Sequence, residues 1–566
     1  MQNCCDNGDT DVVYKDVVII GNGPSGICLS YMLAGNWPYY TGEPHPGDEM
    51  LTARLHFSTK SESEECEHTT GEEVRNGTSK RWHQQSRSER SEAKRPARGL
   101  AGSTRCKLEC LSSGLEGRLG GRPLALLMDQ LQHPCVDAGM DLPSLLTWKS
   151  AEQCNEHKVI DHVVLGKDQP GGAWQSMDPN VLTISLNRWM SLPDLDIREW
   201  EMMVESEERI TAAKPTEDYE LSEYGYQEKP SSGCKTASRV SVGMVAAYYR
   251  DYVRRKGLQQ YFRCGTVVTS VRRVSAPNGT KEDNRYGWAV EGFDKNTGKL
   301  FRYRCKRAVL ATGTTDLSNR LGIPGEESRP QWITQDLNYL ESRLDRLVDQ
   351  QHGEELAERM EPVLVIGAGL SAADAIMAAR FRGIPVLHAF RDTSSEKQHH
   401  TKYDRLQELP SSMYPEYHKV YEMMADGGTN YPLYRALPGY TLVGFDDEQN
   451  RNGRIDALAT EKRVATLSSP DGRLHAFRVS IVAVLIGYKP DLSYLEASGS
   501  GLGRYPDKPI DGKSNPIEVD DFTYEVTNAP AADLYALGPL VGDNFVRYIL
   551  GGAFGILVHI LSTSTT

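Results

Sequence analysis

Apolar positions along this chain fall into short runs that predict strands, each followed by a glycine turn and a helical pattern. Residues 12–20 hold an apolar run that ends at a glycine, and the apolar side chains of 27–33 then recur at helical spacing. Residues 363–382 repeat this order of strand, turn and helix, and another apolar segment follows at 384–390. Strands that alternate with helices in this way are typical of an α/β fold with parallel strands.

Further patterned segments predict the rest of the core. Residues 242–253 place three tyrosines at helical spacing, and we interpret this aromatic stripe as core packing. The apolar run in 545–561 is too short to span a bilayer, so we predict a buried helix there. Alternating or apolar segments predict the remaining strands at 264–274, 286–293, 300–311, 479–486 and 534–537.

Two polar segments interrupt this pattern. Between 58 and 107 large apolar residues are almost absent, and 205–238 is similarly rich in charged and small side chains. Such compositions bury too little apolar surface to offset the entropy of ordering the chain. We therefore predict a disordered insertion over 47–108 and a surface loop over 205–238.

Composition and charge exclude several function classes. The chain has 566 residues, 39% of them hydrophobic, and its net charge is 64 − 77 = −13. An acidic chain without a long basic run is a poor candidate for binding nucleic acid. No stretch reaches the length of a membrane span, and residues 1–11 lack the features of a signal peptide. We therefore expect an intracellular, cytoplasmic protein without a membrane span.

The cysteines argue against disulfide and metal chemistry. There are eleven, none after Cys305, and no two are spaced as C-x-x-C. An odd, uneven set is unlike the disulfide framework of a secreted protein. Because the cysteines and histidines lack the spacing of a zinc site, we predict no metal.

The first glycine turn has the pattern G-x-G-x-x-G. It is formed by Gly21, Gly23, Pro24, Ser25 and Gly26. In such a turn the first glycine makes the bend, the second lets the backbone approach a pyrophosphate, and the third lets helix and strand pack closely. The helix N-terminus then favours the phosphate charge. We predict a dinucleotide site here rather than a simple glycine-rich turn.

The second turn repeats the pattern, with alanine in the third place. It is formed by Gly367, Gly369, Leu370, Ser371 and Ala372. Two turns of this kind imply two nucleotides, one passing electrons to the other. The ordinary pairing is FAD on the first turn and a nicotinamide on the second.

The strand after each helix bears on which nucleotide is bound. After the second turn, strand 385–390 ends at Arg391, where a guanidinium suits a 2′-phosphate, so we favour NADPH over NADH. The alternative is a solvent-facing arginine. After the first turn, the best candidate strand is 162–165, and the place of the usual ribose-binding acid is taken by Gly166. That glycine weakens the prediction of tight adenosine binding.

Several motifs resemble those of the flavin-dependent monooxygenases that oxygenate nitrogen and sulfur. These are the turn from Gly171 through Gly172 to Trp174, then Ala311, Thr312 and Gly313, then I-P-G at 323–325. The chain is more closely similar to the oxidative stress-induced growth inhibitor family of that superfamily. The matching segments are VVIIGNGPSGICLSYMLAG, HVVLGKDQPGGAW, AAYYRDYVRRKGL, RLGIPGE, VLVIGAGLSAADA, MYPEYHKV and GPLVGDNFVRY.

This resemblance implies an activity and cellular roles. It implies a monooxygenase in which NADPH reduces FAD, the reduced flavin and O₂ form a C4a-peroxide, and one oxygen passes to a small-molecule or protein substrate. It also implies roles in restraining growth, in cell death under oxidative stress and in cytokinesis, with a location at the midbody.

The resemblance also implies site residues. Gly542 and Asp543, in the GPLVGDN segment, are candidates for holding the flavin ribityl chain or pyrophosphate, and Asp543 also fits a helix N-cap. The asparagine that flavin monooxygenases of this type use falls at Ile184, and the nearest asparagine is Asn187, three residues later. The F-x-G-x-x-x-H fingerprint expected between the domains is missing, so cofactor binding is better supported than turnover.

We expect two Rossmann-like domains, with the NADPH domain inserted in the FAD domain. The predicted FAD domain comprises 1–46, 109–330 and 470–566, and the predicted NADPH domain comprises 331–469. The leading function is an NADPH-dependent flavin monooxygenase, and the alternative is a catalytically degenerate flavoprotein that acts as a redox sensor or scaffold. A flavin disulfide reductase is disfavoured because the chain lacks a redox cysteine pair.

Overall fold

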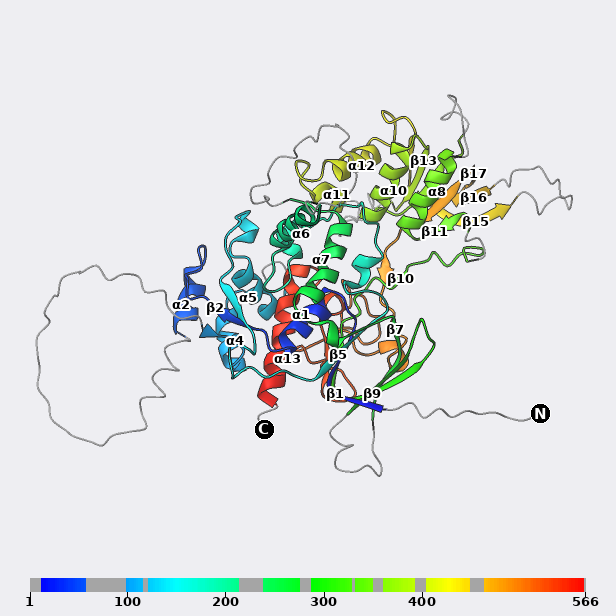
Figure 1. Cartoon of the computed structure of the whole chain (residues 1–566). Coiled ribbons are helices and arrows are strands. Elements are labelled where there is room, and N and C mark those ends of the chain that lie inside the picture. Colours follow the sequence, from blue (N-terminus) through cyan, green and yellow to red (C-terminus); the bar gives the residue numbers. More distant parts are fainter. Residues whose placement is uncertain are drawn as a thin grey trace, which may run out of the picture. The chain divides into compact units, whose positions relative to one another are not determined.

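The chain divides into two compact units, each built around its own sheet (Figure 1). The first unit comprises 1–176, 182–314 and 490–566, and the second comprises 177–181 and 315–489. The computed structural model describes residues 12–57, 98–115, 121–212, 238–274, 287–327, 331–349, 360–391, 404–447 and 463–563.

The main sheet of the first unit has the strand order β6-β5-β1-β9-β8-β7, with β20 also paired to β9. The pairs among β6, β5, β1, β9 and β20 are parallel. Strand β8 pairs antiparallel with both β9 and β7. Six predicted strands, including the one at 162–165, are therefore confirmed. The bounds are β1 Val12–Ile20, β5 His162–Gly166, β6 Phe262–Cys264, β7 Thr266–Arg273, β8 Trp288–Asp294, β9 Leu300–Leu310 and β20 Leu534–Ala536.

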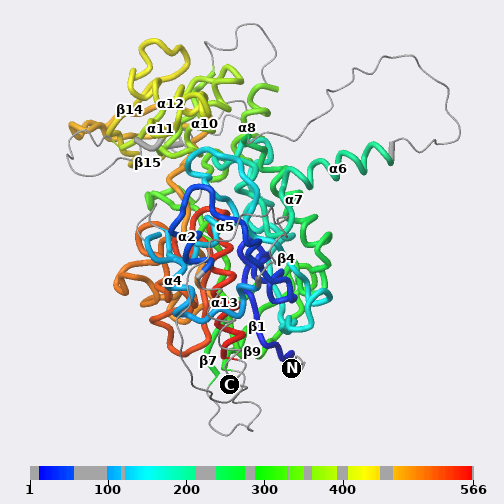
Figure 2. The backbone as a smooth tube through the Cα atoms, turned by 90° about the vertical axis from the view of Figure 1, so that its left-hand side faces the viewer, coloured from blue at the N-terminus to red at the C-terminus, as the bar shows by residue number. Residues whose placement is uncertain are grey.

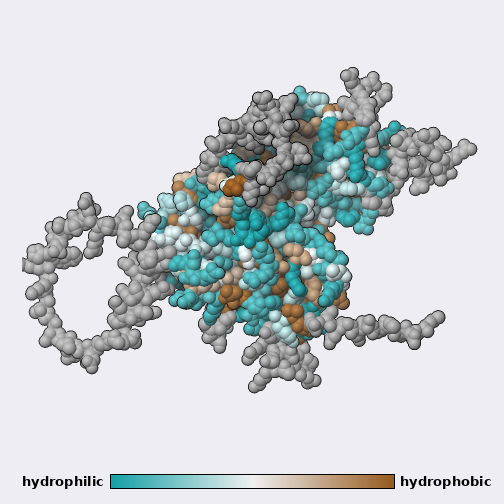
Figure 3. All heavy atoms as spheres, viewed as in Figure 1, coloured by the Kyte–Doolittle hydropathy of each residue, from teal (hydrophilic) through white to brown (hydrophobic). Residues whose placement is uncertain are grey.

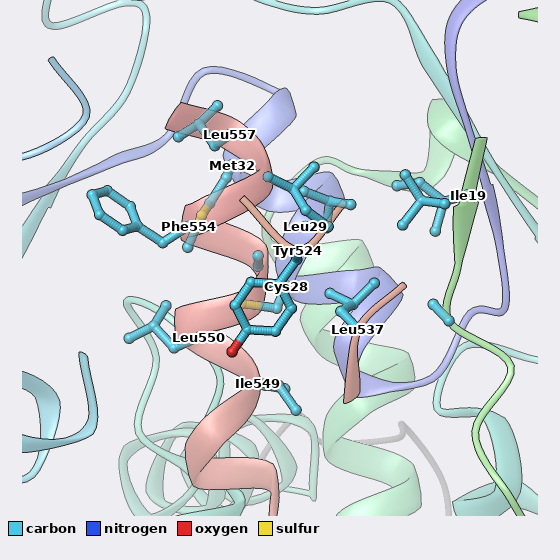
Figure 4. Packing of buried hydrophobic residues seen from close by; sticks show 14 of the residues in the cluster. Ile19, Cys28, Leu29, Met32, Tyr524, Leu537, Ile549, Leu550, Phe554 and Leu557 are labelled. Atoms are coloured by element: carbon cyan, nitrogen blue, oxygen red, sulfur yellow. The ribbon is translucent and has the colours of Figure 1, made fainter. Parts of the chain in front are cut away.

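Helices α1 (Pro24–Leu33) and α13 (Ile549–Thr563) lie side by side in the core of this unit. Figure 4 shows apolar side chains of α13 meeting Cys28, Leu29 and Met32 of α1. Residues 546–563 are long and apolar enough to cross a membrane, but 72% of that segment is buried. The segment therefore packs as a core helix, as predicted, although the predicted reason, that the run is too short to span a bilayer, is wrong.

Helix α7 (Val242–Arg255) carries the predicted aromatic stripe, which is buried. The hydroxyls of Tyr248, Tyr249 and Tyr252 donate to backbone carbonyls of residues 190–195. The stripe therefore packs in the core, and its hydroxyl groups hold the segment before helix α6 (Ile197–Ala212).

The two predicted polar segments are more ordered than expected. Within 47–108, three elements form: α2 (Glu49–Phe57), β3 (Arg98–Gly99) and the start of α4 (Arg105–Ser112). Leu51, Leu55, Leu108 and Leu111 are buried, and Arg54 donates to the carbonyl oxygens of Leu111 and Ser113. Disorder is therefore wrong for the ends of this segment, because contacts distant in sequence order them. Residues 58–97 lie outside the described part.

The loop predicted over 205–238 is also wrong at its start, because α6 continues to Ala212. This helix is anchored by buried Ile197 and Trp200, and its Glu207 pairs with Arg255 of α7 at 2.7 Å. Residues 213–237 lie outside the described part. Beside these helices, α5 (Pro123–Gln132) packs on α13, and β2 (Trp37–Tyr40) pairs with β3 and β4 (Leu146–Lys149).

The second unit is built on a parallel sheet with the order β11-β18-β12-β13-β14. Strand β18 pairs with β12, so residues 470–489 belong to this unit and not, as expected from sequence, to the first domain. Figure 2 traces its backbone from green to orange. The bounds are β11 Ile333–Thr334, β12 Val363–Ile366, β13 Val386–Phe390, β14 Tyr434–Pro438 and β18 Ile481–Val484.

Helix α10 (Leu370–Phe381) follows β12 directly and packs against α8 (Leu337–Asp349) and α12 (Pro415–Ala425), with α11 (Asp404–Glu408) beside α12. Strands β15 (Thr441–Asp447), β16 (Arg463–Ser468) and β17 (Leu474–Arg478) form a separate antiparallel sheet. On the face drawn in Figure 3, hydrophobic residues are scattered among hydrophilic ones, as expected when the apolar side chains are taken up by cores.

Candidate functional site

Two glycines of the first turn are required by the fold itself. Gly21 has φ +114°, and a Cβ there would overlap the carbonyl oxygen of Ala311. A Cβ on Gly26 would overlap the carbonyl oxygen of Gly21. The N–H of Gly21 donates to the carbonyl of Leu165 at 2.8 Å. These two glycines therefore let strand, turn and helix approach one another, as the sequence predicts.

Gly23 differs from both. It precedes α1 as the N-cap residue, and Pro24 occupies the first helical position. Among the described residues, a Cβ on Gly23 would meet only the Cα of Gly172, at 4.0 Å. Backbone is therefore open in front of a helix N-terminus, and this cradle fits the pyrophosphate of a dinucleotide.

The turn that contains Gly172 and Trp174 lies against the first glycine turn. The N–H of Gly171 donates to the carbonyl of Asn22 at 2.9 Å, and a Cβ on Gly172 would lie 2.9 Å from the Cα of Gly23. Trp174 meets the ring of Tyr249 edge-on, with ring centroids 6.1 Å apart. The structure thus brings together two motifs that are about 150 residues apart in sequence.

The motif after β9 reaches the same edge of the sheet. The N–H of Ala311 donates to the carbonyl of Ile20 at 2.8 Å, and Oγ1 of Thr312 lies 3.1 Å from the hydroxyl of Tyr494. Gly313 has φ +75°, and no described atom lies within 4 Å of the place of its Cβ. This motif therefore borders the cradle at the carboxyl ends of parallel strands, where ligands bind in such folds.

The segment Gly538–Asp543 packs on the start of α1. A Cβ on Gly538 would overlap Oγ of Ser25, and Gly542 has φ +95°. The hydroxyl of Tyr524 donates to Oδ2 of Asp543 at 2.9 Å. Burial raises the pKa of Asp543 to about 7. This carboxyl is therefore held in the interior, close to half protonated near neutral pH.

The alternative assignment of Asp543 as a helix cap is wrong. Its described side-chain bond goes to Tyr524, and Phe545 is the N-cap of a short 3₁₀ turn, Val546–Tyr548, that leads into α13. The helix itself begins at Ile549, four residues later than the sequence predicts. The intervening turn is shaped by Arg547, which points into a buried ion pair.

Three polar residues behind this segment escaped the sequence reasoning. The guanidinium of Arg547 binds the fully buried Asp129 through three bonds of 2.6 to 3.1 Å. Arg122 donates to the carbonyl of Val541 at 3.1 Å and to Asp521 at 2.6 Å. These partners are about 400 residues apart in sequence, so local patterns carry no signal for them. These bonds hold the backbone on both sides of Gly542, at Val541 and at Arg547.

At the end of β5, the side chain of Asn22 fills the space next to Gly166. Nδ2 of Asn22 donates to the carbonyl of Asp168 at 2.7 Å. A Cβ on Gly166 would lie 2.5 Å from Oδ1 of Asn22 and closer still to its Cγ. A side chain at Gly166 would therefore overlap the carboxamide of Asn22.

The second glycine turn has the same construction as the first. Gly367 has φ +130°, and a Cβ there would overlap the carbonyl oxygen of Leu485. Gly369 is the N-cap of α10, and no described atom lies within 4 Å of the place of its Cβ. Ala372 is buried where the third glycine would stand. The helix N-terminus, with Leu370 and Ser371 in its first turn, is open to a phosphate.

A buried histidine, also missed from the sequence, braces this turn. Nε2 of His388 donates to the carbonyl of Gly367 at 2.6 Å, and Nδ1 accepts from the hydroxyl of Tyr434 at 2.8 Å. Burial lowers the pKa of His388 to about 4, so the ring is neutral at physiological pH. The neutral ring with one donor and one acceptor satisfies both partners.

Two predicted site residues, Arg391 and Asn187, differ in exposure and in hydrogen bonding. Arg391 is exposed directly after β13, and no described residue partners its guanidinium. Asn187 is buried, and its Oδ1 accepts from the N–H groups of Arg188 at 2.8 Å and Ser238 at 3.3 Å. Arg391 is therefore available to an anion, whereas the amide of Asn187 holds backbone together.

The chain aligns with curated relatives over nearly its whole length. It is 36% identical over 561 residues to oxidative stress-induced growth inhibitor 1 of Mus musculus, which covers 97% of this chain and 95% of the relative. It is 33% identical over 573 residues to oxidative stress-induced growth inhibitor 2 of Homo sapiens, covering 97% and 93%. No protein-family model matches the chain.

Among solved structures, two enzymes resemble this chain with TM-scores below 0.5. The bacillithiol disulfide reductase Bdr from Bacillus cereus is 14% identical with a TM-score of 0.48, covering 97% of this chain and 99% of that one. The ornithine hydroxylase from Pseudomonas aeruginosa is 11% identical with a TM-score of 0.47, covering 98% and 100%.

Proposed function

The chain belongs to the oxidative stress-induced growth inhibitor family, and we propose that it is a flavoprotein monooxygenase that uses FAD and NADPH. One observation carries the proposal: each unit has a glycine turn whose middle glycine opens in front of a helix N-terminus. Two such cradles suit two dinucleotides, one in each unit.

In this proposal each cradle binds one cofactor. The backbone at Gly23 and the N-terminus of α1 bind the FAD pyrophosphate, and Asp543 holds the ribityl chain or the pyrophosphate. The backbone at Gly369 and the N-terminus of α10 bind the NADPH pyrophosphate. Arg391 pairs with the 2′-phosphate, which a guanidinium matches in charge and geometry.

A bound flavin would supply the redox chemistry: NADPH would provide two electrons, one oxygen atom of O₂ would go to a small-molecule or protein substrate, and the other would leave as water. The chain itself binds and orients the cofactor through turns whose positions the fold fixes. Gly172 and Thr312 border the first cradle. The hydroxyl of Tyr524 holds the carboxyl of Asp543 in place by a hydrogen bond.

One observation favours a second candidate, a catalytically degenerate flavoprotein that acts as a redox sensor or scaffold. Asn187 is the candidate catalytic residue, and its amide is engaged with the backbone of Arg188 and Ser238. A sensor needs the bound flavin but not this amide.

The cellular role is also a proposal. The names of the relatives connect them with oxidative stress and growth inhibition, and we extend that role to this chain. A part in cytokinesis and a location at the midbody stay predictions from the family resemblance.

Oxygen consumption by the FAD-reconstituted protein separates the two candidates. With NADPH added and no substrate, a monooxygenase consumes O₂ and releases hydrogen peroxide. A protein that binds FAD but shows no NADPH-dependent O₂ consumption would favour the sensor. Failure to bind FAD at all would contradict both.

A further inference from the structure

Asn22 has an acceptor atom that the fold does not use. The residue is only 4% exposed, and its Nδ2 donates to the carbonyl of Asp168 at 2.7 Å and lies 3.9 Å from Sγ of Cys264. Among the described residues, no group donates to its Oδ1. Although the residue is mostly buried, this oxygen is not one of the fully buried side-chain atoms without a partner. It therefore stays accessible to a hydrogen-bond donor of a bound ligand.

The position of this amide is informative. Strands β1 and β5 are parallel, with Ile20 paired to Leu165, so Gly166 is the first residue beyond the paired ends. In dinucleotide folds this place carries an acidic side chain that accepts from a ribose hydroxyl. The carboxamide of Asn22 occupies the volume in which a side chain at Gly166 would begin.

The second turn provides an internal comparison. Gly21 donates to Leu165 as Gly367 donates to Ala389, so Ala368 corresponds to Asn22 and Phe390 to Gly166. Where the turn carries a small side chain, the strand carries a large one, and the reverse holds in the first turn. The first turn therefore inverts the arrangement of the second, with the larger side chain in the turn and none at the end of the strand.

We infer that the Asn22 carboxamide replaces the acidic side chain and accepts a hydrogen bond from an adenosine ribose hydroxyl in the first site. The inference rests on the proposed function, because it takes the ligand of this site to be FAD. Oδ1 of Asn22 accepts a hydrogen bond from the ribose hydroxyl while Nδ2 keeps donating to the carbonyl of Asp168, so both ends of the amide have a partner when the ligand is bound.

Affinity for FAD and its deoxyribose analogues tests this directly. The apoprotein and the Asn22→Ala variant are titrated with FAD and with analogues lacking the adenosine 2′- or 3′-hydroxyl. We expect the wild type to bind one analogue roughly three- to tenfold more weakly than FAD, the range of one neutral hydrogen bond. Asn22→Ala should bind FAD and that analogue equally.

A variant that keeps the preference for FAD over the analogue would overturn the inference while leaving the proposed function intact. A wild type that binds FAD and both analogues equally would do the same. A wild type that binds no FAD would overturn the proposed function and the inference together.

The shared volume gives an independent test. Gly166→Glu alone should lower both the melting temperature and the affinity for FAD, because the new side chain meets the Asn22 amide. Adding Asn22→Gly should restore both, since the glutamate then has room to accept from the ribose. Restored stability without restored FAD affinity would count against a ribose-binding role for this volume.

Discussion

At the residue scale, Gly23 and Gly26 serve different purposes although they are three positions apart. A side chain at Gly26 meets the carbonyl of Gly21, whereas a side chain at Gly23 enters open space at the N-cap of α1. We predict that Gly26→Ala lowers the melting temperature. Gly23→Asp should keep or raise it, because aspartate is a favourable N-cap, yet abolish FAD binding through steric and charge conflict with the pyrophosphate.

Thermal melts and FAD titrations of the two variants check this contrast. Equal losses of stability in both would mean that Gly23 is also required by the fold, and that its cradle is not reserved for a ligand.

The buried carboxyl of Asp543 predicts a pH effect on the protein without FAD. Burial raises its pKa to about 7, above the ordinary value near 4, so the folded state binds this proton more tightly than the unfolded state. The contribution of Asp543 to stability is therefore greatest below about pH 4 and falls as pH rises to about 7. The loss is on the order of 4 kcal/mol at most.

Urea unfolding of the wild type and Asp543→Asn across this pH range measures the effect. The free energy of unfolding of the wild type should fall, relative to that of Asp543→Asn, as pH rises through this range. A difference independent of pH would show that Asp543 titrates alike in both states.

Arg391 determines the nicotinamide preference in this account. Because the side chain is exposed and without a described partner, Arg391→Ala should leave the melting temperature unchanged. It should weaken NADPH binding by roughly ten- to a hundredfold, the range for a charge-assisted bond, and leave NADH binding unaffected. Parallel titrations with the two nucleotides measure the ratio. Equal weakening of NADPH and NADH binding would show that Arg391 does not recognise the 2′-phosphate.

At the element scale, a buried ion pair joins α5 to the turn that precedes α13. Asp129 is fully buried, and Arg547 also bonds the half-exposed Asp137 at 2.9 Å. Asp129→Ala leaves a buried guanidinium with one remaining partner, and we expect a loss of roughly 3–5 kcal/mol in the free energy of unfolding. The double variant Asp129→Leu with Arg547→Met should lose much less, because no buried charge remains.

Chemical denaturation of the three proteins checks this prediction. A double variant as unstable as Asp129→Ala would indicate that shape, and not the unpaired charge, determines the stability of this contact.

Elements that depend on local pattern were predictable from the sequence, and those that depend on distant contacts were not. The strand, turn and helix units at 12–33 and 363–382 follow from apolar spacing and glycine geometry. Helix α2 was missed because its order comes from α4, about 50 residues later. The coupling of Asn22 with Gly166 was invisible for the same reason, since 144 residues separate them.

At the scale of the whole molecule, each unit has its own sheet, core and glycine turn. The predicted insertion of one domain within another follows the chain order, but the second unit extends to Lys489 because β18 completes its parallel sheet. The glycine turns could be predicted from the sequence because backbone geometry requires glycine at specific positions. The turns are recognisable from sequence, whereas the residues that brace them, such as His388 and Arg122, emerge only from the fold.

We propose that FAD binds the first unit, that NADPH binds the second, and that NADPH reduces the flavin. Anaerobic bleaching of the flavin absorbance by NADPH tests this proposal most directly, in the FAD-reconstituted wild type, Gly23→Asp and Gly369→Asp. We predict that NADPH bleaches the wild type, that Gly23→Asp holds no flavin to bleach, and that Gly369→Asp retains flavin which dithionite bleaches but NADPH does not. A Gly369→Asp protein still bleached by NADPH, or a flavin-loaded wild type that NADPH leaves oxidised, would contradict the account.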